Sequence, residues 1–209
     1  PLVPVGTPLS PPPLPLAPPP LLPPPTQPPV APPPSSPAAA ASCTEDGVAP
    51  LAGYPCNLRL SAEIVLFYEL SDATTTGRRL SEAVLKGRLV CESCTSGGML
   101  GLGFAATPKT MNGATAIIGT SAGGVAIYEL ANYEPTLSAQ QTLFDTEVAA
   151  TDSGLEIAFS APLPLGSGAA DPASLGSVEL LYARGSATNT PSYHGYGSDH
   201  RGGLTATLV

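Results

Sequence analysis

Residues 99–130 read MLGLGFAATPKTMNGATAIIGTSAGGVAIYEL, and this stretch decides the fold class. Apolar residues alternate with glycines over 99–105, and two further apolar runs follow at 114–119 and 124–130. The segment SAGG at 121–124 separates these two runs and is typical of a hairpin turn, because glycine adopts the positive φ that tight hairpins need. We therefore expect three antiparallel strands in succession.

Short strand signals recur on both sides of this stretch. Residues 62–70 form a run of β-branched and aromatic residues, apolar positions alternate over 155–159, and apolar runs cover 178–182 and 204–209. The gaps between the runs are short and rich in Gly, Ser, Asp and Pro. Many short strands at this spacing predict an all-β fold, an antiparallel β-sandwich.

The composition of the chain changes after residue 42. Residues 1–42 hold 19 of the 27 prolines and no charged residue, whereas all 24 charged residues lie in 43–209. Proline lacks a backbone N–H and has a fixed φ, so such a segment is extended as polyproline II helix at about 3.1 Å per residue. We predict an extended proline-rich arm over 1–42 and a β-sandwich domain over 43–209.

Apolar residues interrupt the proline runs of the arm. A pure spacer is expected to use Ser, Thr or Gly at such positions, so apolar inserts favour an arm that packs against another copy of the chain, a fibre or a matrix component. A semi-rigid linker is the alternative. The inserts are Leu14, Leu16, Leu21, Leu22 and Val30.

The arm resembles the hydroxyproline-rich wall and matrix glycoproteins of plants and green algae, which carry runs of Pro with Ser, Ala and Thr. The resemblance implies hydroxylated prolines that bear sugars. The candidate glycosylation positions are Pro11, Pro12, Pro13, Pro18, Pro19, Pro20, Pro23, Pro24, Pro25, Pro32, Pro33, Pro34, Ser35 and Ser36.

The charge balance excludes two classes of partner. The net charge is −8, and the eight basic residues form no cluster beyond Arg78 and Arg79. Nucleic acids and anionic membrane surfaces both require a basic face, so neither is expected as a partner. No apolar run reaches the roughly 18 residues of a membrane-spanning helix. Because the sequence begins at Pro1, we expect a processed or incomplete chain, with any signal peptide or anchor outside it.

Four cysteines indicate an oxidising, extracellular setting. We expect one disulfide between Cys43 and Cys56 at the start of the domain and a small ring between Cys91 and Cys94. A zinc site is an alternative, although the spacing of the four residues matches no common zinc finger. A redox-active free-thiol pair at 91–94 is another, although no helical pattern follows it.

The folded part resembles a DOMON domain. The resemblance is carried by GMLGLGF at 98–104, by TPKTMNGATAIIG at 107–119 and by 125–133. It continues at 154–162 and 178–185, and at the closing Tyr193-His194-Gly195 and Arg201-Gly202. It covers about 56–209 and implies a DOMON-like or immunoglobulin-like sandwich.

Three departures from the DOMON pattern weaken the transfer of function. Met99 stands where a Trp is usual, and Ala161 stands where an Arg is usual before Pro162. Extra residues separate His194 from Arg201, so His200 competes for the role of His194.

The resemblance implies a candidate cofactor site. Cytochrome-type DOMON domains hold a b-haem through one Met and one His, and the matching residues are Met111 and His194, with His200 as the alternative histidine. Thioether and imidazole ligands saturate the iron and favour one-electron transfer over substrate chemistry. Such a haem would be non-covalent, because Thr95 rather than His follows Cys94.

Catalytic motifs are not found in the sequence. No helix pattern follows the glycines at 97–103, which excludes a phosphate-binding loop, and there is no nucleophile elbow. We therefore expect no catalytic residues and no enzyme activity. A calcium site and a sugar-binding platform of aromatic residues are weaker alternatives. The calcium candidates are Asp145, Glu147, Asp152 and Asp199, and the platform candidates are Tyr193, His194 and Tyr196.

Together these features predict an extracellular structural subunit of a fibre, wall or matrix, in which the arm docks on neighbouring copies and the sandwich is a globular bead. A secreted b-type cytochrome is the main alternative, and a carbohydrate-binding module is a further one.

Overall fold

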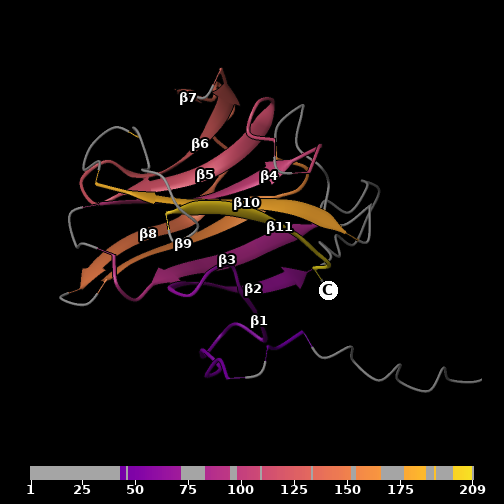
Figure 1. Ribbon diagram of the computed structural model, residues 1–209, viewed down its shortest axis with the longest axis vertical. Helices are drawn as coiled ribbons and strands as arrows, with labels where there is room; N and C mark the ends of the chain where they lie inside the picture. Colours follow the sequence, from indigo (N-terminus) through magenta and orange to yellow (C-terminus); the bar gives the residue numbers. More distant parts are fainter. Residues whose placement is uncertain are drawn as a thin grey trace, which may run out of the picture. The chain divides into compact units, whose positions relative to one another are not determined.

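The computed structural model describes residues 43–45, 47–71, 83–94, 98–108, 110–132, 134–151, 154–165, 177–186, 191 and 200–208. These residues form strands, turns and loops (Figure 1), and no helix capable of crossing a membrane occurs among them. The strands are β1 (Cys56–Arg59), β2 (Ile64–Ser71), β3 (Val84–Cys91), β4 (Met99–Ala105), β5 (Ala114–Thr120), β6 (Gly124–Ala131), β7 (Glu134–Leu137), β8 (Phe144–Thr151), β9 (Gly154–Pro162), β10 (Val178–Gly185) and β11 (Arg201–Ala206).

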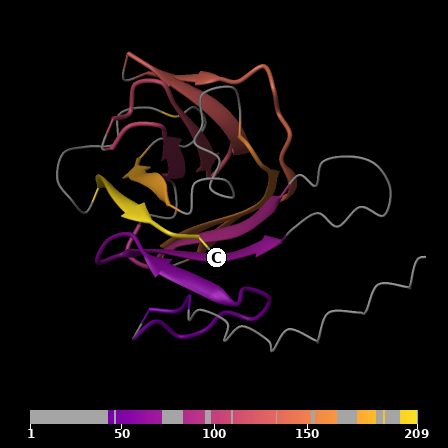
Figure 2. The ribbon, with the colours of Figure 1, turned by 90° about the vertical axis from the view of Figure 1, so that its right-hand side faces the viewer.

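The strands form two antiparallel sheets, which confirms the predicted β-sandwich. The five-stranded sheet has the order β1-β2-β3-β9-β8, and the six-stranded sheet has the order β11-β10-β4-β5-β6-β7. Figure 2 shows the two layers from a second direction. Every strand pair is antiparallel, as expected for a chain with short connections between its strands.

The predicted hairpin between β5 and β6 is confirmed. Thr120 pairs with Gly124, and the N–H of Gly123 donates to the Thr120 hydroxyl at 3.0 Å. Gly124 has a φ of 78°, a conformation in which a side chain would be strained. The glycine at this position therefore lets the chain reverse within three residues.

Four strands were not predicted from the sequence: β1, β3, β7 and β8. Charged residues interrupt the apolar pattern of β3, where Lys86 and Arg88 face outward while Leu85 and Leu89 are fully buried. The strands β1 and β7 have only four residues each, too few for a periodic signal. Strand β8 lies at a sheet edge and is mostly exposed, so its sequence, FDTEVAAT, carries little apolar pattern.

The core lies between the two sheets. Gly119 of β5 faces β9, and a Cβ at this glycine would lie 2.3 Å from Cγ2 of Ile157, so the two sheets approach closely there. The largest fully buried side chains are Phe104, Phe159, Ile64, Leu66, Leu85, Leu89, Leu100, Leu102, Ile117, Ile127, Leu155 and Ile157.

The middle strands of the six-stranded sheet are buried on both faces. Every residue of β4 and β5 is buried, although alternate residues of each strand point away from the core. The outward-pointing residues join a second apolar cluster, which we call the outer-face cluster. It consists of Ala105, Ala114, Ala116, Ile118, Leu130 and Leu181. The middle strands of this sheet therefore differ from β3 of the five-stranded sheet, which carries the charged side chains of Lys86 and Arg88 on its outer face.

The arm predicted over 1–42 lies outside the described residues. Its polyproline II conformation, its glycosylation positions and the domain boundary at residue 43 stay predictions.

Candidate functional site

Two disulfides are formed, as predicted. Cys43 is bonded to Cys56 with a Cα–Cα distance of 4.9 Å, and Cys91 is bonded to Cys94 with a Cα–Cα distance of 5.5 Å. No cysteine is free, so the four thiolates of a zinc site and the free-thiol pair are both absent from this structure. Cys91 is fully buried, and Cys94 retains only 8% exposure.

The first described residues run along the free edge of β1. The N–H of Asn57 donates to the carbonyl of Cys43 at 3.0 Å, and the N–H of Arg59 donates to the Glu45 carboxylate at 2.8 Å. The Asn57 side-chain oxygen accepts a bond from the Glu45 N–H at 2.8 Å. These bonds and the Cys43–Cys56 disulfide fasten the chain to the sandwich at the residue that follows the predicted arm.

Met111 lies in the turn between β4 and β5. Its carbonyl accepts a hydrogen bond of 3.0 Å from the N–H of Ala114, and its side chain is half-buried against the outer-face cluster. Tyr128 of β6 packs against the same cluster, and burial raises the pKa of its hydroxyl. The thioether of Met111 therefore lies in an apolar environment.

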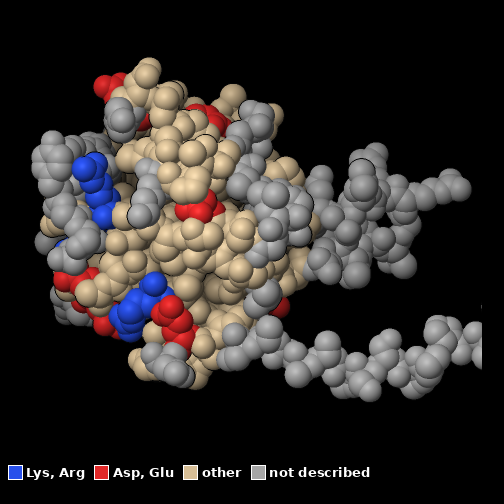
Figure 3. Space-filling model, turned by 45° about the vertical axis from the view of Figure 1, so that its right-hand side comes forward, with Lys and Arg blue, Asp and Glu red and all other residues tan. Residues whose placement is uncertain are grey.

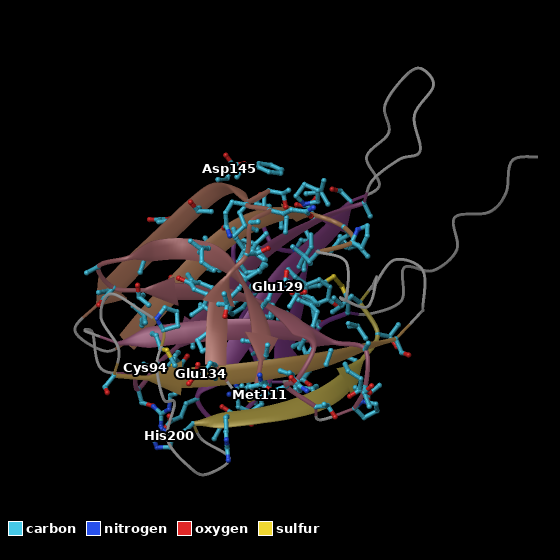
Figure 4. The ribbon with its side chains drawn as sticks, turned by 90° about the horizontal axis from the view of Figure 1, so that it is seen from above. Cys94, Met111, Glu129, Glu134, Asp145 and His200 are labelled. Carbon is cyan, nitrogen blue, oxygen red and sulfur yellow. A yellow bond between two sulfur atoms is a disulfide. The ribbon has the colours of Figure 1, made fainter. Side chains whose placement is uncertain are left out.

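The structure does not bring Met111 and His200 together. The carbonyl of His200 accepts a bond of 2.8 Å from the N–H of Arg184, and Arg184 pairs with Leu100. Met111 joins the sheet at the other end of β4, beyond Phe104. Four residues of strand correspond to about 13 Å, and Figure 4 also shows the two side chains apart. His194, the first choice of ligand, lies outside the described residues.

The calcium candidates do not converge either. Asp145 is exposed, and Glu147 is 3.7 Å from the Arg88 guanidinium, so its charge already has a partner. Asp152 and Asp199 lie outside the described residues, as do Tyr193 and Tyr196 of the predicted sugar platform. Among the described residues, no group of three His, Cys, Asp or Glu side chains is placed to hold a metal.

The outer face of the five-stranded sheet carries a polar network. Arg88 lies 2.9 Å from Glu156, and Lys86 donates to the carbonyl of Gly53 at 3.2 Å. The Lys86 ammonium also stacks on the Tyr54 ring, 4.9 Å from its centroid. Burial raises the pKa of Tyr54, Arg88 lowers it, and the neighbouring glutamates raise it further. These contacts hold residues 51–54 against β3.

A second polar cluster joins the two sheets and was not predicted. Arg184 of β10 lies 2.6 Å from Glu63, which precedes β2. Its guanidinium also donates to the carbonyl of Ser93 at 3.4 Å and to Sγ of Cys94 at 3.8 Å. These residues are far apart in the chain, so no spacing in the sequence signals the cluster.

A third polar cluster lies near the β6–β7 edge. Glu129 accepts hydrogen bonds from Thr115 at 3.2 Å and from Ser138 at 3.1 Å. The Gln141 side chain pairs with the backbone of Ile127 through bonds of 2.9 and 2.8 Å. Because these groups satisfy one another, they close the edge of the sandwich rather than present a reactive group.

Figure 3 shows a face made mostly of uncharged residues, with Lys and Arg atoms next to Asp and Glu atoms in its lower part. Among the described residues, Arg88 pairs with Glu147 and Glu156, and Arg184 pairs with Glu63, so these charges support the fold. No family model matches the sequence, and no curated protein matches it.

Proposed function

We propose that this chain is an extracellular structural subunit of a fibre, wall or matrix. In this proposal the arm over 1–42 is glycosylated and docks on neighbouring copies or on a fibre, and the sandwich, of the DOMON-like or immunoglobulin-like kind, is the globular bead.

The observation that carries the proposal is the disulfide at the junction. Cys43 directly follows the predicted arm and is bonded to Cys56, the first residue of β1. Tension applied to the arm therefore enters the sheet through a covalent bond, and residues 44–55 lie within the closed loop. A tether that must bear load benefits from such an anchor.

Two further observations support an extracellular structural role. Disulfides persist in oxidising compartments and are rare in the cytosol. The polar clusters among the described residues are internally paired, as expected for a bead whose polar groups stabilise the fold.

Deleting residues 1–42 tests the proposal, with assembly followed by sedimentation velocity and electron microscopy. We expect the full chain to form large assemblies and the shortened chain to form none. A matched variant with serine at Leu14, Leu16, Leu21, Leu22 and Val30 keeps the length and the prolines of the arm. It should also form no large assemblies, because the apolar inserts supply the contact made by the arm. Normal assembly of the shortened chain would refute the proposal.

A secreted b-type cytochrome is the second candidate. The half-buried thioether of Met111 against an apolar cluster supports it, since a haem requires an apolar site. His194 would be the partner ligand, because His200 joins the sheet far from Met111. A Soret band after haem reconstitution that is lost in Met111→Leu and in His194→Ala would favour this candidate. A carbohydrate-binding module stays a third candidate, resting on the platform residues of the sequence alone.

A further inference from the structure

The four sheet edges of the sandwich differ in how they are protected. An unprotected edge strand offers unpaired N–H and C=O groups to another strand, so proteins usually blunt their edges. The edge of β1 is covered by Cys43 and Glu45, which bind its outward N–H groups. The edge of β8 is irregular, with a register shift between Phe144 and Glu147 and a φ of 50° at Asp145.

The edge of β7 is also protected. The N–H of Ser138 donates to the carbonyl of Ile127 at 2.9 Å, and the alternation of an antiparallel ladder then turns Pro135 and Leu137 outward. Proline has no N–H to offer, and the strand is only four residues long.

Among the residues that the structure describes, none of these features protects the edge of β11. It is six residues long, without proline, and its pairing with β10 is regular from Arg201 to Ala206. No strand pairs with its other side in the part of the chain that the structure describes. Figure 4 shows β11 as the outermost strand on its side of the sheet.

The register identifies which backbone groups point outward from β11. The N–H of Arg184 donates to the carbonyl of His200 directly opposite, so these two residues form a hydrogen-bonded pair. Such pairs alternate along an antiparallel ladder. The backbone groups of Gly203 and Thr205 therefore point away from β10.

We infer that β11 pairs antiparallel with β11 of a second copy and joins the two six-stranded sheets into one. A two-fold axis at Gly203 places Gly203 of each copy opposite its equivalent and Arg201 opposite Thr205. Such a contact is self-complementary, as a two-fold interface requires.

Charge complementarity favours this register. Glu179 of β10 pairs with Thr205 and accepts a hydrogen bond from its hydroxyl, so both lie on the outer face together with Arg201. Across the two-fold axis, Arg201 of one copy is two strands from Glu179 of the other, about 10 Å between backbones. Extended Arg201 and Glu179 side chains together span this distance. The two-fold axis gives the interface two such Arg201–Glu179 pairs.

The other face of β11 is complementary in shape. Tyr182 lies over Gly202, where an added Cβ would be 2.4 Å from the tyrosine oxygen. Leu204 is only partly buried. In the inferred register, Leu204 of the second copy lies opposite Gly202. It therefore covers the exposed edge of the contact between Tyr182 and Gly202.

The inference does not depend on the proposed function. It concerns a contact between sandwiches, whereas the arm is proposed to contact a neighbour through apolar inserts. If both hold, two-fold pairs of beads are linked by arms into a branched assembly.

The test is the mass of the full chain in solution, measured by sedimentation equilibrium. The arm carries the five serine replacements given above, so that assembly through the arm does not interfere. We expect twice the 20.9 kDa mass of the chain. Arg201→Glu and Glu179→Arg should each weaken the dimer about tenfold, because both symmetric pairs become repulsive, and the double exchange should restore it.

A second pair of variants tests the backbone contact. Thr205→Pro removes an outward N–H without breaking a backbone hydrogen bond to β10, so the dimer should be lost. Thr205→Val loses the same hydroxyl bond to Glu179 but keeps the N–H, so it should still dimerise. Leu137→Pro makes the same change at the outward position of β7 and should leave the mass unchanged. A monomeric parent chain, or dimers that persist in Thr205→Pro and in both charge reversals, would overturn the inference. Such results leave the proposal for the arm unaffected.

Discussion

Single residues join parts of this fold that the sequence keeps far apart. Arg184 links β10 to Glu63 and to the carbonyl of Ser93, so one guanidinium connects both sheets and the Cys91–Cys94 ring. Arginine suits this position because its planar fork donates several hydrogen bonds at fixed angles. Tyr54 has a similar role on the outer face of the five-stranded sheet, between Lys86 and the Arg88 network.

Tyr54 should make stability depend on alkaline pH. Burial raises its pKa above the ordinary value of 10.0, so the unfolded chain ionises first as the pH rises. The contribution of Tyr54 is therefore complete below about pH 10 and is lost as the pH rises through the folded-state pKa. In urea unfolding between about pH 9 and pH 11, Tyr54→Phe should lose less unfolding free energy than the parent chain. Equal losses in the two proteins would contradict this expectation.

At the scale of elements, the two disulfides have different roles. The Cys43–Cys56 bond has a sequence separation of 13 and fastens the segment before β1 to that strand, whereas the Cys91–Cys94 bond has a separation of 3 and closes a turn after β3. Of the two cysteines in the ring, Cys94 is the less buried, with 8% exposure against 0% for Cys91. Attack there by an external thiolate would expel the thiolate of Cys91 into the core, which is unfavourable. We therefore regard the ring as structural.

The disulfides should differ in their contribution to stability. Loop-closure entropy assigns about 3 kcal/mol to the longer loop and about 2 kcal/mol to the ring. Cys43→Ala/Cys56→Ala should therefore lower the free energy of unfolding by more than Cys91→Ala/Cys94→Ala, as measured by urea unfolding under oxidising conditions. The reverse order would mean that packing of the buried Cys91 outweighs chain entropy.

At the scale of the whole domain, the middle strands β4 and β5 of the six-stranded sheet are buried on both faces, whereas β3 in the five-stranded sheet is buried on one. The outer-face cluster contains small side chains and Met111 packs against it, whereas Lys86 and Arg88 face outward on the other sheet. An antiparallel sheet usually has one solvated face, so a second apolar face indicates a covering layer. In the proposed cytochrome a haem would lie at this face beside Met111, whereas the proposed bead has no haem. Haem reconstitution distinguishes the two proposals.

The sequence by itself determined the fold class and most strands of the six-stranded sheet, and it favoured two local cysteine pairs without excluding the alternatives. These features depend on local patterns: alternation in β9, glycines in the β5–β6 turn, and cysteines close together in the chain. Four strands escaped prediction because they are short, exposed or interrupted by charged residues at outward positions.

Only the tertiary structure decided which polar residues meet and which candidate ligands lie apart. The registers of β4 and β10 separate Met111 from His200 and bring Arg184 to Glu63. They also leave β11 as the one regular edge in the described part of the chain. These relations depend on strand order and register, which arise from packing between segments distant in sequence, so local residue patterns carry no signal of them.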